Sequence, residues 1–311
     1  MRARSNTPHV AVLLCTYEGE QYLREQLDSI IKQDYENFSL WVSDDSADSA
    51  SRQIVEEYQA KWPTKVRSIR VGPRAGSSAN FLSLLMDDGI KAEYFALSDQ
   101  DDIWHRDKLS RSIEALEFCS PRQPLLYCSR VTLINEFGKA IGMSPLFSKP
   151  PNFANALVQS IAGGNTMVLN EKARQAISQS RVTDVVLHDW WLYLLITGIG
   201  GRVIYDPAPT ILYRQHSANQ IGCNQSFIAA LKRLVSVLKG QHRIWHDQNI
   251  QALERCAAQL SIENTNNLNQ FILCRRSRFL KRLRLLHGLR FYRQTFSGQI
   301  SLYLTFLFGK L

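Results

Sequence analysis

The chain has 311 residues, of which 45% are hydrophobic and 21% are charged. This composition excludes the disordered, fibrous and disulfide-dense classes and leaves room for one large globular domain with an appendage. The formal net charge is +9, but residues 271–311 carry nine Lys or Arg, and no Asp or Glu follows Glu263. The remaining basic residues equal the acidic ones in number, so the chain is a neutral body with a basic tail.

The sequence shows no targeting or membrane-spanning segment. The first residues are basic and polar, and the apolar run 10–15 is too short for a secretory leader. No stretch of about 18 apolar residues exists, so we expect no spanning helix. The six cysteines show neither a Cys-x-x-Cys pair nor regular spacing. We therefore expect reduced thiols in a cytoplasmic protein.

Strand and helix patterns alternate through the first 120 residues. The apolar runs predict strands at 9–15, 38–45, 65–71 and 93–99. Helical periods predict helices at 22–31, 46–60, 81–86 and 107–118. This alternation is typical of βαβ units on a mostly parallel sheet, and it predicts an α/β fold.

The alternation ends after Pro121. The patterns farther along the chain predict a strand at 125–134, a mobile Pro/Gly-rich loop at 138–153, a turn and strand at 162–170, helices from 171 and at 188–200, and two short strands within 201–219. From about residue 225 the chain is predicted to be helical and amphipathic.

Three carboxylates, Asp99, Asp101 and Asp102, follow the fourth predicted strand. Oxygen ligands this close repel one another unless a cation neutralises them, and Mg²⁺ or Mn²⁺ commonly accompanies phosphates. A doubly wound sheet binds its ligands at the carboxyl edge of the strands. The segment therefore predicts a metal–diphosphate site. A solvated acidic turn before the next helix is the alternative that these residues leave open.

Other polar residues end the neighbouring strands. Asp45 follows the second strand, and Thr16 and Tyr17 follow the first, on the same rim of a parallel sheet. A carboxylate there can accept hydrogen bonds from a nucleobase or a ribose, and a tyrosine ring can stack on a base. Taken alone, Asp45 is better explained as the start of a turn.

Six stretches in order resemble a family 2 glycosyltransferase of the GT-A fold, and most of all the bacterial rhamnosyltransferase-like enzymes of O-antigen and polysaccharide assembly. The resemblance spans residues 8 to about 220. The stretches are VAVLLCTYEGEQYLREQLDSIIKQDY, WVSDDSADS, ALSDQDDIWHRDKL, AGGNTMVLN, HDWWLYLL and LYRQHSAN. The resemblance implies a GT-A catalytic domain at 1–220, which leaves 221–311 as a helical, basic region.

The resemblance also implies a role for each matching position. Asp189 would be the catalytic base. The nucleotide sugar would be held by Thr16, Tyr17, Asp45, Asn80 and Asp99. The ligands of Mg²⁺ or Mn²⁺ would be Asp101, Asp99 and His216, and the acceptor side would be lined by Gly164, Asn165 and Trp190. Core packing is the alternative for the Trp190–Trp191 pair, and a structural role is the alternative for His216.

The chain departs from the family pattern in small ways. The common DDGS turn is DDSA here, Cys15 stands where a polar residue is usual, and His188 replaces the Glu that precedes the catalytic Asp. These departures bear on the selectivity for base and sugar more than on activity.

The resulting expectation is an inverting, metal-dependent transfer of a sugar from a nucleotide-diphosphate sugar, dTDP-rhamnose by family likeness, to a hydroxyl of a glycan carried on a polyprenyl diphosphate. Such a displacement needs one general base and a cation for the leaving diphosphate. A nucleotidyltransferase is one alternative, although CTYEGE lacks the Gly-rich phosphate loop with Lys or Arg. An inactive sugar- or lipid-binding protein is the other, and the joint presence of DQD, HDWW and YRQH argues against it.

The basic tail has three interpretations. Basic residues alternate with Phe279, Leu280, Leu283 and Leu286, as in an interfacial helix on an anionic membrane. A nucleic-acid patch lacks any recognised module, and a helix that packs on the catalytic domain is the plainer alternative. We expect no nucleic-acid partner and a peripheral location on the inner face of the cytoplasmic membrane.

Overall fold

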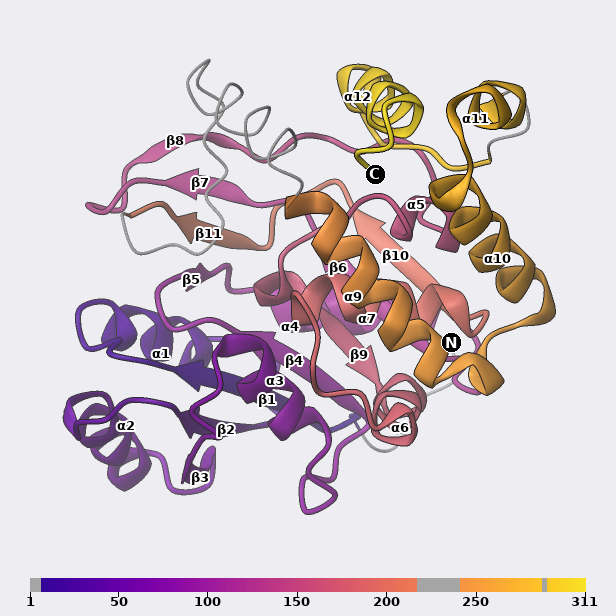
Figure 1. Cartoon of the computed structure of the whole chain (residues 1–311). Coiled ribbons are helices and arrows are strands. Elements are labelled where there is room, and N and C mark those ends of the chain that lie inside the picture. Colours follow the sequence, from indigo (N-terminus) through magenta and orange to yellow (C-terminus); the bar gives the residue numbers. More distant parts are fainter. Residues whose placement is uncertain (1–6, 217–240, 287–289) are drawn as a thin grey trace.

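The computed structural model describes residues 7–216, 241–286 and 290–311, and its centre is a seven-stranded sheet (Figure 1). The strand order is β10-β6-β9-β4-β1-β2-β3. The strands are β1 (Val10–Thr16), β2 (Phe38–Asp44), β3 (Val66–Val71), β4 (Tyr94–Ser98), β6 (Leu125–Ser129), β9 (Val168–Asn170) and β10 (Arg202–Asp206). All neighbours pair in parallel except β9, which runs antiparallel to both β4 and β6. The predicted α/β fold with a mostly parallel sheet is confirmed.

A second, four-stranded sheet has the order β5-β11-β7-β8. Its strands are β5 (Ile103–Trp104), β7 (Thr132–Ile134), β8 (Ala140–Met143) and β11 (Ile211–Arg214). The single strand predicted at 125–134 is wrong, because the chain breaks there and places β6 and β7 in different sheets. The loop predicted at 138–153 contains β8, whose four residues are all exposed, so it carries no burial pattern that the sequence could reveal.

Helices cover both faces of the large sheet. They are α1 (Leu23–Ile31), α2 (Ala50–Lys61), α3 (Ser77–Leu85), α4 (Lys108–Glu117), α5 (Phe153–Ala156), α6 (Glu171–Ser180), α7 (His188–Gly198), α9 (Gln241–Arg255), α10 (Ile262–Arg276), α11 (Phe279–Leu286) and α12 (Phe296–Leu307). Along β1, Val12 and Leu14 belong to the apolar core shared with α1, α2 and α4, whereas Leu13 belongs to the core shared with α3, α6 and α7. Burial on both faces explains the unbroken apolar run of β1.

The C-terminal helices belong to the second of these cores. Leu253 of α9, Phe271 of α10 and Phe306 of α12 are buried together with Trp191 of α7. Figure 1 shows α9 and α10 running beside α5 and α7. The predicted domain boundary near residue 220 lies outside the described residues, so the division of the chain into two domains stays a prediction. None of the helices in the described ranges is long and apolar enough to cross a membrane.

Candidate active site

The ends of β1 and β4 are joined through backbone and side-chain hydrogen bonds. The backbone N–H of Tyr17 donates to Gln100 Oε1 at 2.7 Å, and Gln100 Nε2 donates to the Tyr17 carbonyl at 2.9 Å. Thr16 Oγ1 donates to Asp44 Oδ1 at 2.8 Å. Thr16 is thus buried against the neighbouring strand, whereas the Tyr17 side chain is 59% exposed. The Tyr17 ring is therefore accessible to solvent at this edge, whereas Thr16 links β1 to β2.

Asp45 and Asn80 meet at Gly72. Asp45 Oδ1 accepts from the backbone N–H of Arg74 at 2.9 Å, and Asn80 Nδ2 donates to the Ser43 carbonyl at 3.0 Å. A Cβ atom at Gly72 would lie 2.1 Å from Asp45 Oδ1 and 2.7 Å from Asn80 Oδ1. A side chain at this position would therefore force Asp45 and Asn80 to shift, and these are two residues that the resemblance assigns to the nucleotide sugar.

Asp101 of the acidic segment is paired with His216, which follows β11. His216 Nε2 lies 2.8 Å from Asp101 Oδ2, and the two side chains are 16% and 18% exposed. The neighbouring Asp99 is partly buried, and burial followed by the charges of Asp101 and Asp189 raises its pKa. Two of the three predicted metal ligands are thus in contact.

A resident metal site made of protein ligands alone is absent from the described part of the chain, where no three His, Cys, Asp or Glu side chains are gathered for one. The Asp101–His216 pair nevertheless fits a divalent cation that takes its other ligands from a diphosphate. Mg²⁺ characteristically uses one or two carboxylates together with substrate phosphates, and imidazole suits several of the other divalent metals.

Asp102 points away from the Asp101–His216 pair into the protein. Asn165 Nδ2 donates to Asp102 Oδ2 at 2.6 Å, the backbone N–H of Arg214 donates to Asp102 Oδ1 at 3.2 Å, and Lys108 Nζ donates to the Asn165 carbonyl at 2.8 Å. Burial raises the pKa of Asp102 and lowers the pKa of Lys108 to about 7. The side chain of Asn165, which was predicted to line the acceptor side, is thus engaged in holding Asp102.

Arg214 connects the acidic segment to the second sheet, and sequence reasoning missed it. Its Nε donates to the Asp101 carbonyl at 3.0 Å, Nη1 to the Glu136 carbonyl at 2.9 Å, and Nη2 to Glu25 Oε2 at 2.6 Å. The side chain is 1% exposed. The only signal in the sequence was its place in LYRQH, and nothing local indicated partners more than 70 residues away.

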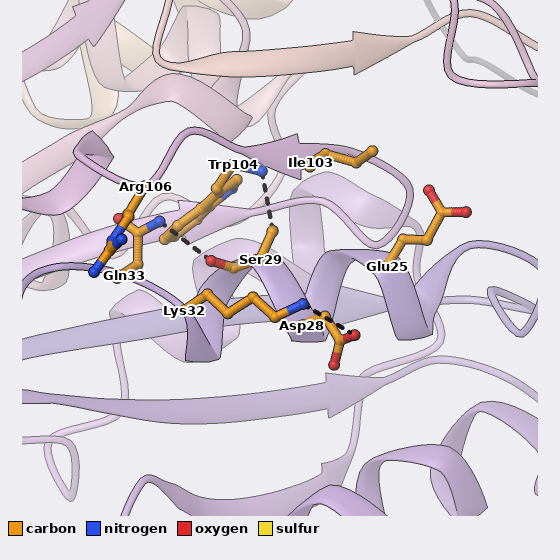
Figure 2. A pocket seen from close by; sticks show the side chains of 8 residues that line it. All are labelled: Glu25, Asp28, Ser29, Lys32, Gln33, Ile103, Trp104 and Arg106. Atoms are coloured by element: carbon orange, nitrogen blue, oxygen red, sulfur yellow. Dashed lines mark hydrogen bonds and ion pairs between the residues drawn. The ribbon is translucent and has the colours of Figure 1, made fainter.

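A groove beside this segment lies between α1 and β5 (Figure 2). Within it, Trp104 donates its backbone N–H to Ser29 Oγ at 3.0 Å, and Lys32 lies 3.6 Å from Asp28. None of the residues predicted to bind donor, metal or acceptor is among those that line it. The groove is therefore separate from the candidate site.

Asp189 lies half-buried in the first turn of α7. Its carboxylate accepts the backbone N–H of Trp190 at 2.5 Å and also that of Gly164. Burial raises the pKa of Asp189 to about 6, although these hydrogen bonds oppose the shift. The side chain is therefore ionised at neutral pH and still basic enough to accept a proton. The predicted base and the predicted Gly164 are brought together.

His188 is buried in contact with Gly164. A Cβ atom on Gly164 would fall 2.2 Å from His188 Nε2, and the imidazole stacks on Phe81 with the ring centroids 4.3 Å apart. Burial lowers the pKa of His188 to about 3. Where the family pattern has an acidic residue, this chain therefore places a neutral ring, and neither of its nitrogens finds a hydrogen-bond partner among the described residues.

Trp190 is 5% exposed, and its Nε1 donates to the Ala156 carbonyl at 2.7 Å. Trp191 is fully buried as well. The structure therefore gives both tryptophans a packing role, which was the alternative to sugar stacking. The predicted acceptor-side group is not assembled as a single exposed surface, because Asn165 and Trp190 both point into the protein.

The sequence and the fold are similar to those of known proteins. Residues 11–121 match the family model described as Glycosyl transferase family 2. The dTDP-rhamnosyl transferase RfbG of Shigella flexneri is 29% identical over 261 residues, which are 81% of this chain and 86% of the relative.

Two solved structures align over nearly the whole chain. S. aureus TarS 1-349 in complex with UDP-GlcNAc has a TM-score of 0.53 at 16% identity, covering 96% of this chain and 90% of that one. The mannosyltransferase PcManGT from Pyrobaculum calidifontis, in complex with GDP-Man and Mn²⁺, has a TM-score of 0.51 at 16% identity and covers 98% and 85%. At such identities these two likenesses show a common fold.

Proposed function

Because the chain is a family 2 glycosyltransferase of the GT-A fold, we propose that it transfers a sugar with inversion from a nucleotide-diphosphate sugar to a glycan hydroxyl in cell-surface polysaccharide synthesis. The observation that carries the proposal is the position of Asp189. It is close enough to the strand edge for its charge to contribute to the raised pKa of Asp99. We infer that Asp189 supplies the one general base that a single displacement requires.

In the proposed reaction Asp189 accepts the proton of the acceptor hydroxyl. Its pKa of about 6 leaves it ionised at neutral pH, and a base of that strength is well matched to proton transfer near neutrality. The N–H groups of Gly164 and Trp190 fix the direction of the carboxylate. An inverting reaction needs only this one base, whereas a retaining glycosidase would require a second facing carboxylate that acts as the nucleophile.

The diphosphate would lie at Asp101 and His216. A bound Mg²⁺ or Mn²⁺ would neutralise the charge that develops on the leaving diphosphate. Asp101 and His216 would hold the cation from one side, and Arg214 would keep the Asp101 backbone in place through its 3.0 Å bond to the carbonyl. The Mn²⁺ in the structure of the Pyrobaculum calidifontis mannosyltransferase supports this part of the proposal by similarity of fold.

We further propose dTDP-rhamnose as the donor and a lipid-linked glycan as the acceptor. The support for rhamnose is the 29% identity to the Shigella flexneri dTDP-rhamnosyl transferase. Tyr17 would stack on the base, with Asp45 and Asn80 beside the nucleoside at Gly72, where their polar atoms converge.

The decisive experiment is a thermal-shift series with dTDP, UDP and GDP, each with Mn²⁺, with Mg²⁺ and with EDTA. A ligand that binds only the folded state raises the melting temperature by mass action. We expect stabilisation by dTDP that requires a divalent cation and disappears in the Asp101→Asn variant. The exposed Asp34→Asn is the matched control and should behave as wild type. Equal stabilisation in EDTA would refute the metal role, and no response to any nucleotide would refute the donor class.

A further inference from the structure

The last two described helices, α11 and α12, have one face inside the protein. Leu302 and Phe306 of α12 are buried in the core that also contains α5 and α7. Arg282 of α11 donates to the Leu307 carbonyl at 3.4 Å and to the Arg275 carbonyl at 3.1 Å. The two helices are therefore anchored to each other and to the fold.

Their other faces carry large apolar side chains in contact with solvent. On α12 and just beyond it these are Phe296, Ile300, Tyr303, Leu304 and Phe308, and on α11 they are Phe279, Leu280 and Leu283. At 3.6 residues per turn each set occupies one side of its helix. Phe296 is 83% exposed and Leu280 is 72% exposed. A concentration of exposed apolar side chains on adjacent helices is unusual for a surface that faces only water.

Basic residues surround these apolar faces. Three of the nine basic residues in 271–311 are used internally, because Arg275 bonds to Asp247 and the Leu311 carbonyl, Arg282 to the carbonyls named above, and Arg293 to the Val158 carbonyl. The others are exposed, namely Arg276, Arg278, Lys281, Arg284, Arg290 and Lys310. No Asp or Glu follows Glu263, so this part of the chain has no acidic side chain to balance them.

We propose that α11 and α12 form a docking surface for an anionic lipid bilayer, with their exposed apolar side chains entering the headgroup region and their exposed Lys and Arg side chains contacting lipid phosphates. Apolar and basic side chains on one helical surface match an interface that is apolar inside and negatively charged outside. A nucleic acid would engage the charges but not the aliphatic side chains, so the combination favours lipid. The inference does not depend on the sugar that is transferred.

This surface is mechanically connected to the candidate active site. The Tyr292 carbonyl, in the segment that leads into α12, accepts from Asn155 Nδ2 of α5 at 2.8 Å, and Asn155 Oδ1 accepts from the Tyr193 hydroxyl of α7 at 2.8 Å. The first turn of α7 carries Asp189. Docking through α11 and α12 would therefore hold the proposed base, Asp189, at a fixed distance from the membrane, where the proposed lipid-linked acceptor would lie.

The test uses the full-length chain and co-sedimentation with vesicles of phosphatidylcholine alone or mixed with phosphatidylglycerol. We expect binding to the mixed vesicles at low salt, little binding to phosphatidylcholine, and release at high salt because the Debye length shrinks. The double variant Lys281→Glu/Arg284→Glu should lower the partition coefficient by about tenfold or more, since each basic residue near the surface contributes measurably. The double variant Phe296→Gln/Leu304→Gln should also weaken binding without changing the melting temperature.

Matched controls come from the opposite part of the chain. Lys172→Glu removes an exposed charge, and Phe118→Gln removes a phenylalanine that is 84% exposed. Both controls should bind vesicles as wild type does. Failure of the wild-type chain to bind the mixed vesicles would overturn the proposal, and so would an equal loss in the controls. Tight binding to RNA or DNA that is sensitive to the charge variants alone, in the absence of vesicle binding, would overturn it in favour of a nucleic-acid surface.

Discussion

The acidic segment after β4 and the helices α11 and α12 differ in where their ionisable side chains lie, inside the fold or on its surface. Asp102 is fully buried and receives hydrogen bonds from Asn165 and the Arg214 backbone. Lys281 and Arg284 are exposed on a stretch of chain that contains no acid. A buried ionisable group needs hydrogen-bond partners within the fold because desolvation is costly, whereas an exposed charge can remain available to an external partner.

The C-terminal helices likewise contain both buried and exposed side chains. Phe271 of α10 packs edge-on against Phe291, with the ring centroids 5.3 Å apart, while Phe296 of α12 is exposed. Phenylalanines of the same basic tail therefore lie either in the core or on the surface. The interpretations of the tail as a packed helix and as an interfacial helix are consequently compatible, because each applies to a different face.

The largest expected effect concerns the packed face. Phe271→Ala should lower the free energy of unfolding by about 3–5 kcal/mol, the range for removing a buried aromatic ring. Phe296→Ala should change it by less than about 0.5 kcal/mol, as for an ordinary surface substitution. Urea denaturation of both variants measures the difference. Equal losses would mean that the two faces do not differ as the structure has them.

The next expected effect concerns the candidate base. Asp189→Asn should leave donor binding near the wild-type value and lower turnover by about 10²-fold or more, the usual scale for the loss of a general base. The isosteric amide retains an oxygen for the N–H groups of Gly164 and Trp190. Nucleotide release from dTDP-rhamnose and nucleotide affinity are measured in parallel, with the exposed Asp184→Asn as control. A collapse of donor affinity would instead assign Asp189 to donor binding.

The third prediction compares the contribution of a buried arginine to stability with that of an exposed arginine. Arg214→Ala should lower the free energy of unfolding by about 1–3 kcal/mol, because it leaves the carbonyls of Asp101 and Glu136 without their donor. Metal-dependent nucleotide binding should weaken as well. The comparison variant is Arg24→Ala, which breaks a 2.7 Å ion pair with Glu57 on the surface. Surface pairs contribute little, so a similar loss in both variants would count against the compensating role of Arg214.

The smallest expected effect is a pH dependence. Burial raises the pKa of Asp189 to about 6, and a base acts only when ionised, so activity requires a pH above that value. Turnover should therefore be level at neutral pH and fall by about tenfold per unit once Asp189 becomes protonated. Turnover of the Asp189→Asn variant should lack this limb. A wild-type profile without a break between pH 5 and 7 would contradict the assignment.

Local sequence patterns were sufficient to predict the central strands of the large sheet. The apolar runs that became β1, β2 and β4 lie within about one residue of their predicted bounds, because strands buried on both faces leave a continuous apolar signature. The parallel arrangement of those strands then placed the residues at their ends on one rim. The contacts of Tyr17 with Gln100 and of Asp45 with Thr16 follow from that arrangement.

Only the tertiary structure decided which way each of the other side chains points. Asp101 faces His216 while its neighbour Asp102 faces Asn165, and Trp190 is buried although HDWW alone left its direction open. The partners of Arg214 are 78 to 189 positions distant in the sequence. The periodicity of apolar residues predicts whether a residue is buried, but it does not predict which residues it contacts. Those contacts depend on how segments that are distant in the sequence pack together.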